Sequence, residues 1–282
     1  MALSDRIDKA YEVVLDDLMA ARTDGGHWEG ELASSPLGTA VAVAALCVAA
    51  DNVREESTDG DAFEERFGRD GALVRRGVGY LLRTQHDDGG WGDTDRDGSN
   101  ISATILAVAA LRLSGARTAE VRAAIDRANV YIENCGGLDA LRRRYGRDKT
   151  FVVPILTAGA LAGMYGWHEV APLPFELACL PHQWYRAVRM PVVSYAIPAL
   201  VAMGVCRDVQ LRPRNPLVRL LRRKLRRKAI DIARNMQPES GGFLEATPLT
   251  GFVVMALASS GWRMHPVVER GLAFLRNSIR ED

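Results

Sequence analysis

The residues in this chain that come closest to a catalytic acid are three aspartates in one polar stretch. Asp93, Asp95 and Asp97 alternate along Asp-Thr-Asp-Arg-Asp, directly after a Gly-Gly-Trp-Gly turn. A carboxyl group can act as a general acid only where its surroundings keep it protonated, through burial or a neighbouring carboxylate. These aspartates have no adjacent acidic partner, so we interpret the stretch as a solvated or capping loop. We therefore predict no catalytic residue within this chain.

The cysteine and histidine residues do not form a metal-ligand pattern. The four cysteines are Cys47, Cys135, Cys179 and Cys206, with no Cys-x-x-Cys pair and no histidine close enough in sequence to complete a zinc site. We expect reduced, buried thiols, as is usual for free cysteine. No metal and no cofactor are predicted.

The elements that position these residues repeat along the chain. In the clearest copy, Gln85 ends one helix, a tight turn leads to Trp91, and an apolar helix follows over Ile101–Leu113. A helix that is apolar on all sides must be buried within a larger helical assembly. Related turns recur before and after this one, and recurrence at this spacing indicates a repeat architecture. The turn residues assigned a structural role are Gly26 and Trp28 in the first copy, Gln85, Gly90 and Trp91 in the second, and Gln237, Gly242 and Phe243 in the last.

Between the turns, the hydrophobic pattern predicts paired outer and inner helices, and so an all-α fold. The first outer helix is marked by apolar residues from Leu3 to Leu18 at helical spacing. A weaker turn is expected at 135–138, with leucine in place of tryptophan. The inner helices are expected over Leu37–Ala50, Ile101–Leu113, Phe151–Met164 and Thr250–Ser260.

The C-terminal segment repeats an earlier one. Residues 268–282 match residues 74–88 position for position, and the earlier copy continues into Gly89-Gly90-Trp91. The last copy stops before its own turn, so no inner helix follows the final outer helix. We therefore expect an α/α barrel that is incomplete at the C-terminus, in the N-terminal piece of a longer protein.

Residues 207–228 carry the strongest charge bias in the chain. Ten basic residues against Asp208 give this segment a charge of +9, and the whole chain has a net charge of +1. The leucines Leu217, Leu221 and Leu225, with Arg222 and Arg226 between them, describe a basic amphipathic helix that a membrane surface would accept. A solvated helix that balances the acidic remainder is the alternative. Nucleic-acid binding is not expected, because no aromatic residues interleave the charges.

Several of these features together resemble the squalene–hopene cyclase family of triterpene cyclases. Gln85-His-Asp-Asp-Gly-Gly-Trp91 resembles the QW motif of that family, and Asp24-Gly-Gly-His-Trp28 is similar to its early Asp-Gly-x-Trp element. The stretches 132–137 and 172–176 are similar to later landmarks of the same N-terminal half. The resemblance implies one α/α barrel (toroid) domain over 1–282, with a basic insert at 207–228.

The resemblance also implies a function. Enzymes of this family, which are isomerases, cyclise squalene or a related polyprenoid through carbocations that aromatic side chains stabilise. Their acid is an Asp-x-Asp-Asp motif, which this sequence lacks. A missing C-terminal domain or a completing partner would have to supply it. The residues expected to line the substrate cavity are Trp184, Tyr185, Met190 and Tyr195, with packing as the alternative role. Family members sit on one face of a membrane, so a peripheral (monotopic) position on the cytoplasmic side is implied.

Two other classes of protein remain open. A non-catalytic lipid-binding or scaffold barrel would also lack the acid. Protein prenyltransferase β-subunits share a barrel of helical hairpins but hold zinc through an Asp-x-Cys pattern that is absent here. This class is therefore the less favoured one.

Overall fold

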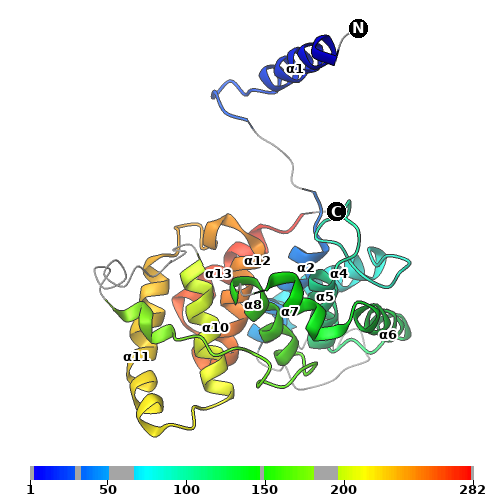
Figure 1. Ribbon diagram of the computed structural model, residues 1–282. Coiled ribbons are helices and arrows are strands. Elements are labelled where there is room, and N and C mark those ends of the chain that lie inside the picture. Colours follow the sequence, from blue (N-terminus) through cyan, green and yellow to red (C-terminus); the bar gives the residue numbers. More distant parts are fainter. Residues whose placement is uncertain (1–2, 29–32, 51–66, 147–148, 181–195, 281–282) are drawn as a thin grey trace. The chain divides into compact units, whose positions relative to one another are not determined.

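The computed structural model describes residues 3–28, 33–50, 67–146, 149–180 and 196–280 (Figure 1). Within these residues the regular secondary structure is helical, apart from one isolated bridge between Arg22 and Trp28. The all-α prediction is therefore confirmed. The chain divides into two compact units, residues 1–34 and residues 35–282, which are described separately.

The first unit consists of one helix and the turn that follows it. Helix α1 spans Leu3–Ala20, and none of its residues is buried. Its apolar residues, which recur at helical spacing, are at least two-fifths exposed from Leu3 through Leu18. The helix thus has an amphipathic pattern.

The second unit is an α/α barrel built around inner helices. The inner helices are α2 (Pro36–Ala49), α5 (Ile101–Ser114), α8 (Lys149–Leu161), α10 (Ile197–Gln210) and α12 (Thr247–Leu257). Each packs against the next in this order, and α12 packs against α2, so the inner helices of the described chain form a closed ring. The four predicted inner helices correspond to α2, α5, α8 and α12.

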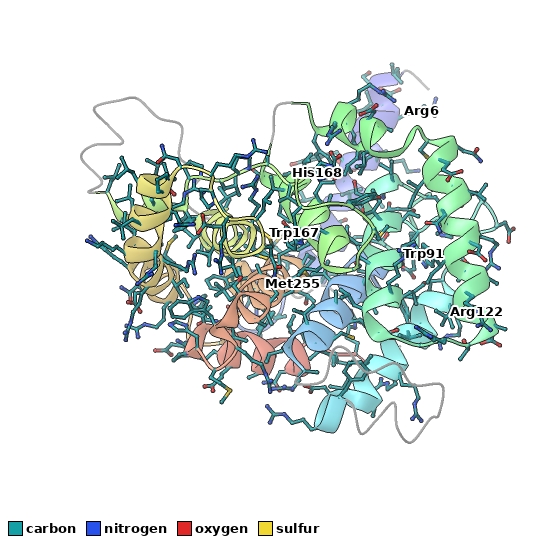
Figure 2. The ribbon with its side chains drawn as sticks, turned by 90° about the horizontal axis from the view of Figure 1, so that it is seen from below. Arg6, Trp91, Arg122, Trp167, His168 and Met255 are labelled. Carbon is teal, nitrogen blue, oxygen red and sulfur yellow. The ribbon has the colours of Figure 1, made fainter. Side chains whose placement is uncertain are left out.

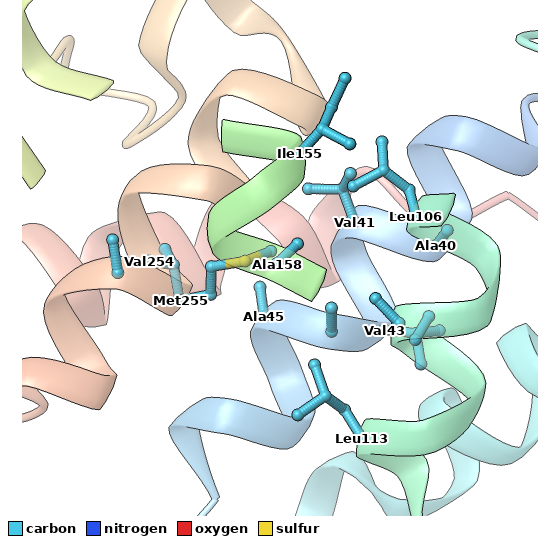
Figure 3. Packing of buried hydrophobic residues seen from close by; sticks show 14 of the residues in the cluster. Ala40, Val41, Val43, Ala45, Leu106, Leu113, Ile155, Ala158, Val254 and Met255 are labelled. Atoms are coloured by element: carbon cyan, nitrogen blue, oxygen red, sulfur yellow. The ribbon is translucent and has the colours of Figure 1, made fainter. Parts of the chain in front are cut away.

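Small side chains let the inner helices approach closely. In α5 every residue from Ile101 to Ser114 except Arg112 is buried. A Cβ atom added to Gly251 of α12 would lie 2.7 Å from Cγ1 of Val41 in α2, so these two helices leave no space for a larger side chain. Figure 3 shows Val41, Ala45 and Met255 within this packed interior. Ser35 and Asn100 start α2 and α5 by accepting hydrogen bonds from the first free N–H groups of each helix.

Amphipathic outer helices cover this interior. They are α4 (Gly71–Arg83), α6 (Ala119–Asn134), α7 (Gly137–Tyr145), α11 (Pro216–Asn235) and α13 (Pro266–Asn277). Short helical turns complete the unit: η1 (Gly68–Asp70), η2 (Phe175–Cys179), η4 (Phe243–Glu245) and η5 (Ala258–Trp262). No helix among the described residues is long and apolar enough to cross a lipid bilayer.

The sequence match between 74–88 and 268–282 has a structural counterpart. Gly77 of α4 faces Val43 and Thr39 of α2, and a Cβ at this position would overlap Val43. Gly271 of α13 faces Val254 and Thr250 of α12 in the same way, with an added Cβ 2.6 Å from Val254 Cγ2. Helix α13 therefore packs against α12 through a glycine in the same way as α4 packs against α2.

This equivalence changes the expectation of an incomplete barrel. After α4, the next inner helix in the ring is α5; after α13, the corresponding place beside α12 is occupied by α2. Helix α2 also contacts α13, and Arg276 of α13 forms an ion pair with Asp70 at 2.7 Å. Among the described residues, α2 therefore occupies the place beside α12 that follows α13 in the ring.

The structure also bears on the weak third turn and on the basic segment. The weak third turn at 135–138 does not form like the others, because Gly137 begins α7, a helix that hydrophobic periodicity did not reveal. Residues 216–228 of the basic segment form the first part of α11, which packs on α10 and η2. Residues 216–228 are therefore part of the outer layer of helices.

Candidate functional site

Gln85 joins its own turn to the next outer helix. Its side-chain Nε2 donates to the carbonyl oxygen of Gly89 at 2.9 Å and to that of Ala124 in α6 at 2.8 Å. Arg127, one turn further along α6, donates to Gln85 Oε1. The glutamine thus uses both ends of its amide, and the turn is tied to α6.

Trp91 joins α4 to α5. Its ring, labelled in Figure 2, is fully buried, and its Nε1 donates to the carbonyl oxygen of Leu81 at 2.8 Å. Leu81 lies in the last turn of α4, where carbonyl groups have no partner within the helix. The main-chain N–H of Trp91 donates to Oγ1 of Thr104 in α5 at 3.1 Å.

The glycine two positions before the tryptophan is required by the backbone. Gly89 has a φ of 87°, in the left-handed region that side chains disfavour. An added Cβ would lie 2.6 Å from the carbonyl oxygen of Arg127. The turn therefore approaches α6 as closely as its backbone allows.

The last turn repeats this geometry. Gln237 donates to the carbonyl oxygen of Gly241 at 2.8 Å and to that of Val267 in α13 at 3.1 Å. Gly241 also has a φ of 87°, and the N–H of Phe243 donates to Thr250 Oγ1 at 2.9 Å. Phenylalanine has no ring N–H, so the bond made by the Trp91 indole has no equivalent here.

The first turn, within residues 1–34, is a third copy with one substitution. Arg22, six residues before Trp28, donates through Nε to the carbonyl oxygen of Gly26 at 3.0 Å. Trp28 Nε1 donates to the carbonyl oxygen of Leu18 at 2.5 Å, ten residues earlier, as Trp91 does to Leu81. Sequence analysis missed Arg22, although its position relative to Trp28 matches that of Gln85 relative to Trp91.

The aspartates after Trp91 stabilise their own loop. Asp97 accepts hydrogen bonds from the N–H and the hydroxyl of Thr94 at 3.1 and 2.7 Å, and Asp93 accepts one from Asn100 at 2.9 Å. All three aspartates are exposed. Among the residues that the structure describes, no group of three acidic, histidine or cysteine side chains is placed to hold a metal ion. This geometry is that of a capping loop.

The basic segment turns two of its arginines inward. Arg222 is 8% exposed and pairs with Glu176 at 3.1 Å and with Asp208 at 3.3 Å. Arg226 pairs with the other oxygen of Asp208 at 2.8 Å. Arg222 and Arg226 were predicted to face a membrane, which does not fit these inward positions. Nothing in the local sequence pattern indicated their distant acidic partners.

The leucines of the same segment divide between two environments. Leu217 and Leu221 are exposed, whereas Leu225 is half-buried. Around them, burial lowers the pKa of Arg207, and the nearby Arg222 lowers it further. Because, of these three leucines, only Leu217 and Leu221 are exposed, the prediction that leucines of this segment contact a membrane surface stays a prediction for these two residues.

The other predicted groups lie as follows. Trp184, Tyr185, Met190 and Tyr195, expected to line a cavity, fall outside the described residues. Cys47 and Cys206 are buried as expected, and burial raises the pKa of Cys206 to about 11. Cys135 is exposed, so the expectation of a buried thiol is wrong there. The described residues thus contain a set of bracing turns rather than an assembled catalytic centre.

Comparison with known protein families agrees with the repeated turns. Residues 12–220 match the family described as the squalene-hopene cyclase N-terminal domain. The match begins within α1 and extends into α11, so it includes two of the three turns. The match covers well over half of the chain, and the chain therefore belongs to the squalene-hopene cyclase N-terminal domain family.

Proposed function

We propose that this chain is the cavity-shaping N-terminal part of a terpene cyclase that acts on squalene or a related polyprenoid. The observation that carries the proposal is the family match over residues 12–220. In this role the chain contributes to triterpenoid biosynthesis without supplying the acid, because it contains no Asp-x-Asp-Asp motif. A protonated carboxyl group is needed to start cationic cyclisation.

Side chains fill the interior of the barrel. This packing supports a role in which the barrel forms one side of the substrate cavity and does not enclose the substrate. Gly251 approaches Val41 closely, and an added Cβ at Gly159 of α8 would lie 2.7 Å from the ring of Tyr165. Residues such as Leu106, Ala158 and Met255 fill the interior (Figure 3). A long polyprenoid would therefore lie against a face of the barrel, where a second domain can close over it.

In this proposal a further domain or a completing partner supplies the acid that starts the reaction.

Turnover of squalene provides the test. The purified chain is incubated with squalene in detergent micelles, alone and together with the polypeptide encoded after residue 282 or any co-purifying Asp-x-Asp-Asp protein, and products are identified by mass spectrometry. The proposal predicts no product from the chain alone and cyclic product from the pair. The matched control pair carries Asn in place of the last aspartate of the partner's motif.

Two outcomes would contradict the proposal. Cyclic product from the chain alone would mean that its own carboxyl groups start the reaction. Full turnover by the acid-bearing partner without this chain would mean that the chain is a scaffold or lipid-binding barrel, the alternative raised by its sequence.

A further inference from the structure

The connection from the last turn to its inner helix is shorter than the matching connection in the second turn. In the second turn, the main-chain N–H of Trp91 donates to the hydroxyl of Thr104 in α5, 13 positions later. In the last turn, the N–H of Phe243 donates to the hydroxyl of Thr250 in α12, only 7 positions later. The same bond is therefore made with a much shorter stretch of chain between its ends.

The short connection has a strained backbone. Leu244 and Glu245 have φ values of 53° and 52°, and among the residues that the structure describes they are the only ones other than glycine with a positive φ. This left-handed conformation is unfavourable for any residue with a Cβ atom. Leu244 is 60% exposed and Glu245 is exposed as well, so burial of their side chains does not offset the strain.

The start of α12 also lacks the cap that α5 has. Asn100 accepts hydrogen bonds from the N–H groups of Ser102 and Ala103 at 3.1 and 3.0 Å. Ala246 occupies the equivalent place before α12, four positions ahead of the threonine, and makes no side-chain cap. A helix start without a capping side chain is less stable. The strained connection thus leads into a weak first turn of α12.

One exposed hydrogen bond holds the strained connection. The hydroxyl of Ser240 donates to Oε1 of Glu245 at 2.6 Å and accepts from the N–H of Gly242 at 3.2 Å. Both Ser240 and Glu245 are exposed. A backbone in a sparsely populated conformation persists only where its surroundings hold it, and here the Ser240 hydroxyl supplies that restraint.

We propose that residues 244–249 form a two-state element, in which the first turn of α12 unwinds to release the strain of Leu244 and Glu245. In the wound state, which is the state of this structure, the bond between Ser240 and Glu245 acts as a catch. In the unwound state, residues 247–249 lengthen the connection, so that the two strained residues adopt an extended backbone. This inference rests on the last turn alone and does not depend on the cyclase role.

The contacts on either side confine the change to this element. Gln237 is bonded to Val267 of α13, and Phe243 is 2% exposed. Gly251 packs closely on Val41 of α2, so α12 belongs to the packed interior from this residue onward. The start of α12 can therefore change conformation while the ring of inner helices stays closed.

Hydrogen exchange of the intact chain, followed for single amides by NMR, tests the inference. The N–H of Thr250 donates to the carbonyl oxygen of Ala246 at 3.0 Å and reports on the first turn of α12. The N–H of Thr104, bonded to Asn100 at 3.1 Å, is the matched reporter in α5. After correction for intrinsic rates, we expect Thr250 to exchange at least about tenfold faster than Thr104.

The variant Leu244→Gly distinguishes release of strain from ordinary fraying. Glycine adopts a left-handed backbone without strain, so this variant should stabilise the wound state and slow the exchange of Thr250 about threefold. In a connection that is only flexible, glycine would speed exchange instead. The control is Leu211→Gly, at an exposed leucine with an ordinary φ of −130°, where exchange of the residue's own amide should become faster.

Two further variants act on the catch and on the cap. Ser240→Ala removes the donor to Glu245 and should speed the exchange of Thr250 about fivefold. Ala246→Asn supplies the missing cap and should slow it about fivefold. Combining Ser240→Ala with Leu244→Gly should return the rate toward that of the parent chain. Circular dichroism and melting temperature verify that each variant is folded.

The opposing results are specific. Exchange of Thr250 as slow as that of Thr104 in the parent chain would overturn the proposal. So would unchanged or faster exchange in the Leu244→Gly variant, or an unchanged rate in Ser240→Ala. Exchange of all α12 amides at the rate of Thr250 would show that the opening is not confined to the first turn, which also contradicts the proposal.

Discussion

Gln85 and Ala124 are joined by a 2.8 Å hydrogen bond from the glutamine amide to a main-chain carbonyl oxygen, across 39 positions of sequence. Gln237 and Val267 are joined in the same way at 3.1 Å. In both cases the residue three positions after the acceptor is an arginine that also bonds to the turn, Arg127 to Gln85 and Arg270 to Pro238. Each turn therefore clamps the outer helix of the following hairpin.

Replacing Gln85 by alanine should release this clamp. The variant leaves the carbonyl groups of Gly89 and Ala124 without their side-chain donor, and we expect a loss of about 2 kcal/mol in the free energy of unfolding. Chemical denaturation measures it. The control is Gln210→Ala, which removes an exposed 3.3 Å bond to Ser259 and should cost less than about 0.5 kcal/mol. Equal losses in the two variants would argue against a bracing role for Gln85.

The two causes of the glycine requirement at position 89 can be separated. Gly89→Ala combines backbone strain with overlap against Arg127 and should cost at least about 3 kcal/mol. Gly163 has a φ of 68° but no neighbouring atom within 4 Å of an added Cβ. Gly163→Ala should therefore cost about 1 kcal/mol, the strain alone. The close approach to α6 is refuted if both substitutions prove equally mild in thermal denaturation.

Substituting Trp91 by phenylalanine tests the indole bond that Phe243 lacks. The ring remains apolar, but the carbonyl group of Leu81 loses its 2.8 Å donor and the smaller ring leaves a gap. We expect a loss of about 2 kcal/mol, measured by urea unfolding. A neutral Trp91→Phe variant would assign the tryptophan to packing alone.

His265 should make stability depend on pH. Its Nδ1 accepts from the N–H of Val267 at 3.3 Å at the start of α13, and burial lowers its pKa from 6.5, with Arg234 and Arg227 adding to the shift while Asp231 and Glu269 oppose it. The unfolded chain therefore binds the proton more readily. The contribution to stability is complete above a pH of about 6.5 and is lost as pH falls through the lower pKa of the folded state.

The matched variant for this prediction is His265→Asn, which keeps a capping acceptor but does not titrate. Melting temperatures are compared between pH values of about 7.5 and 5.5. The parent chain should lose stability relative to the variant as the pH falls. Parallel curves would show that His265 does not contribute.

The helices could be predicted from the sequence because the local pattern of apolar and polar residues determines them. A segment such as 101–113, apolar on every side, can only be an inner helix, and Thr118 or Pro266 marks where an outer helix begins. The three turns were found by their glycine and aromatic residues. Arg22 was missed because arginine replaces glutamine there while keeping the same bond to the turn.

Contacts between residues that are distant in the sequence could not be predicted in the same way. The match of 268–282 to 74–88 is real, but the sequence does not show that α2 fills the place beside α12. The inward orientation of Arg222 depends on Glu176 and Asp208, 46 and 14 positions away. Helical periodicity identified an amphipathic helix but did not show which of its sides faces the barrel, because periodicity contains no information about buried ion pairs.

The closure of the barrel by α2 is the central structural claim, and hydrogen exchange of the intact chain tests it most directly. If α2 seals the ring between α12 and α5, its amides should exchange only through global unfolding, at the same slow rate as those of α5 and α12. Fast exchange in α2 while α5 and α12 remain protected would show that the ring is open at this seam and would contradict the account.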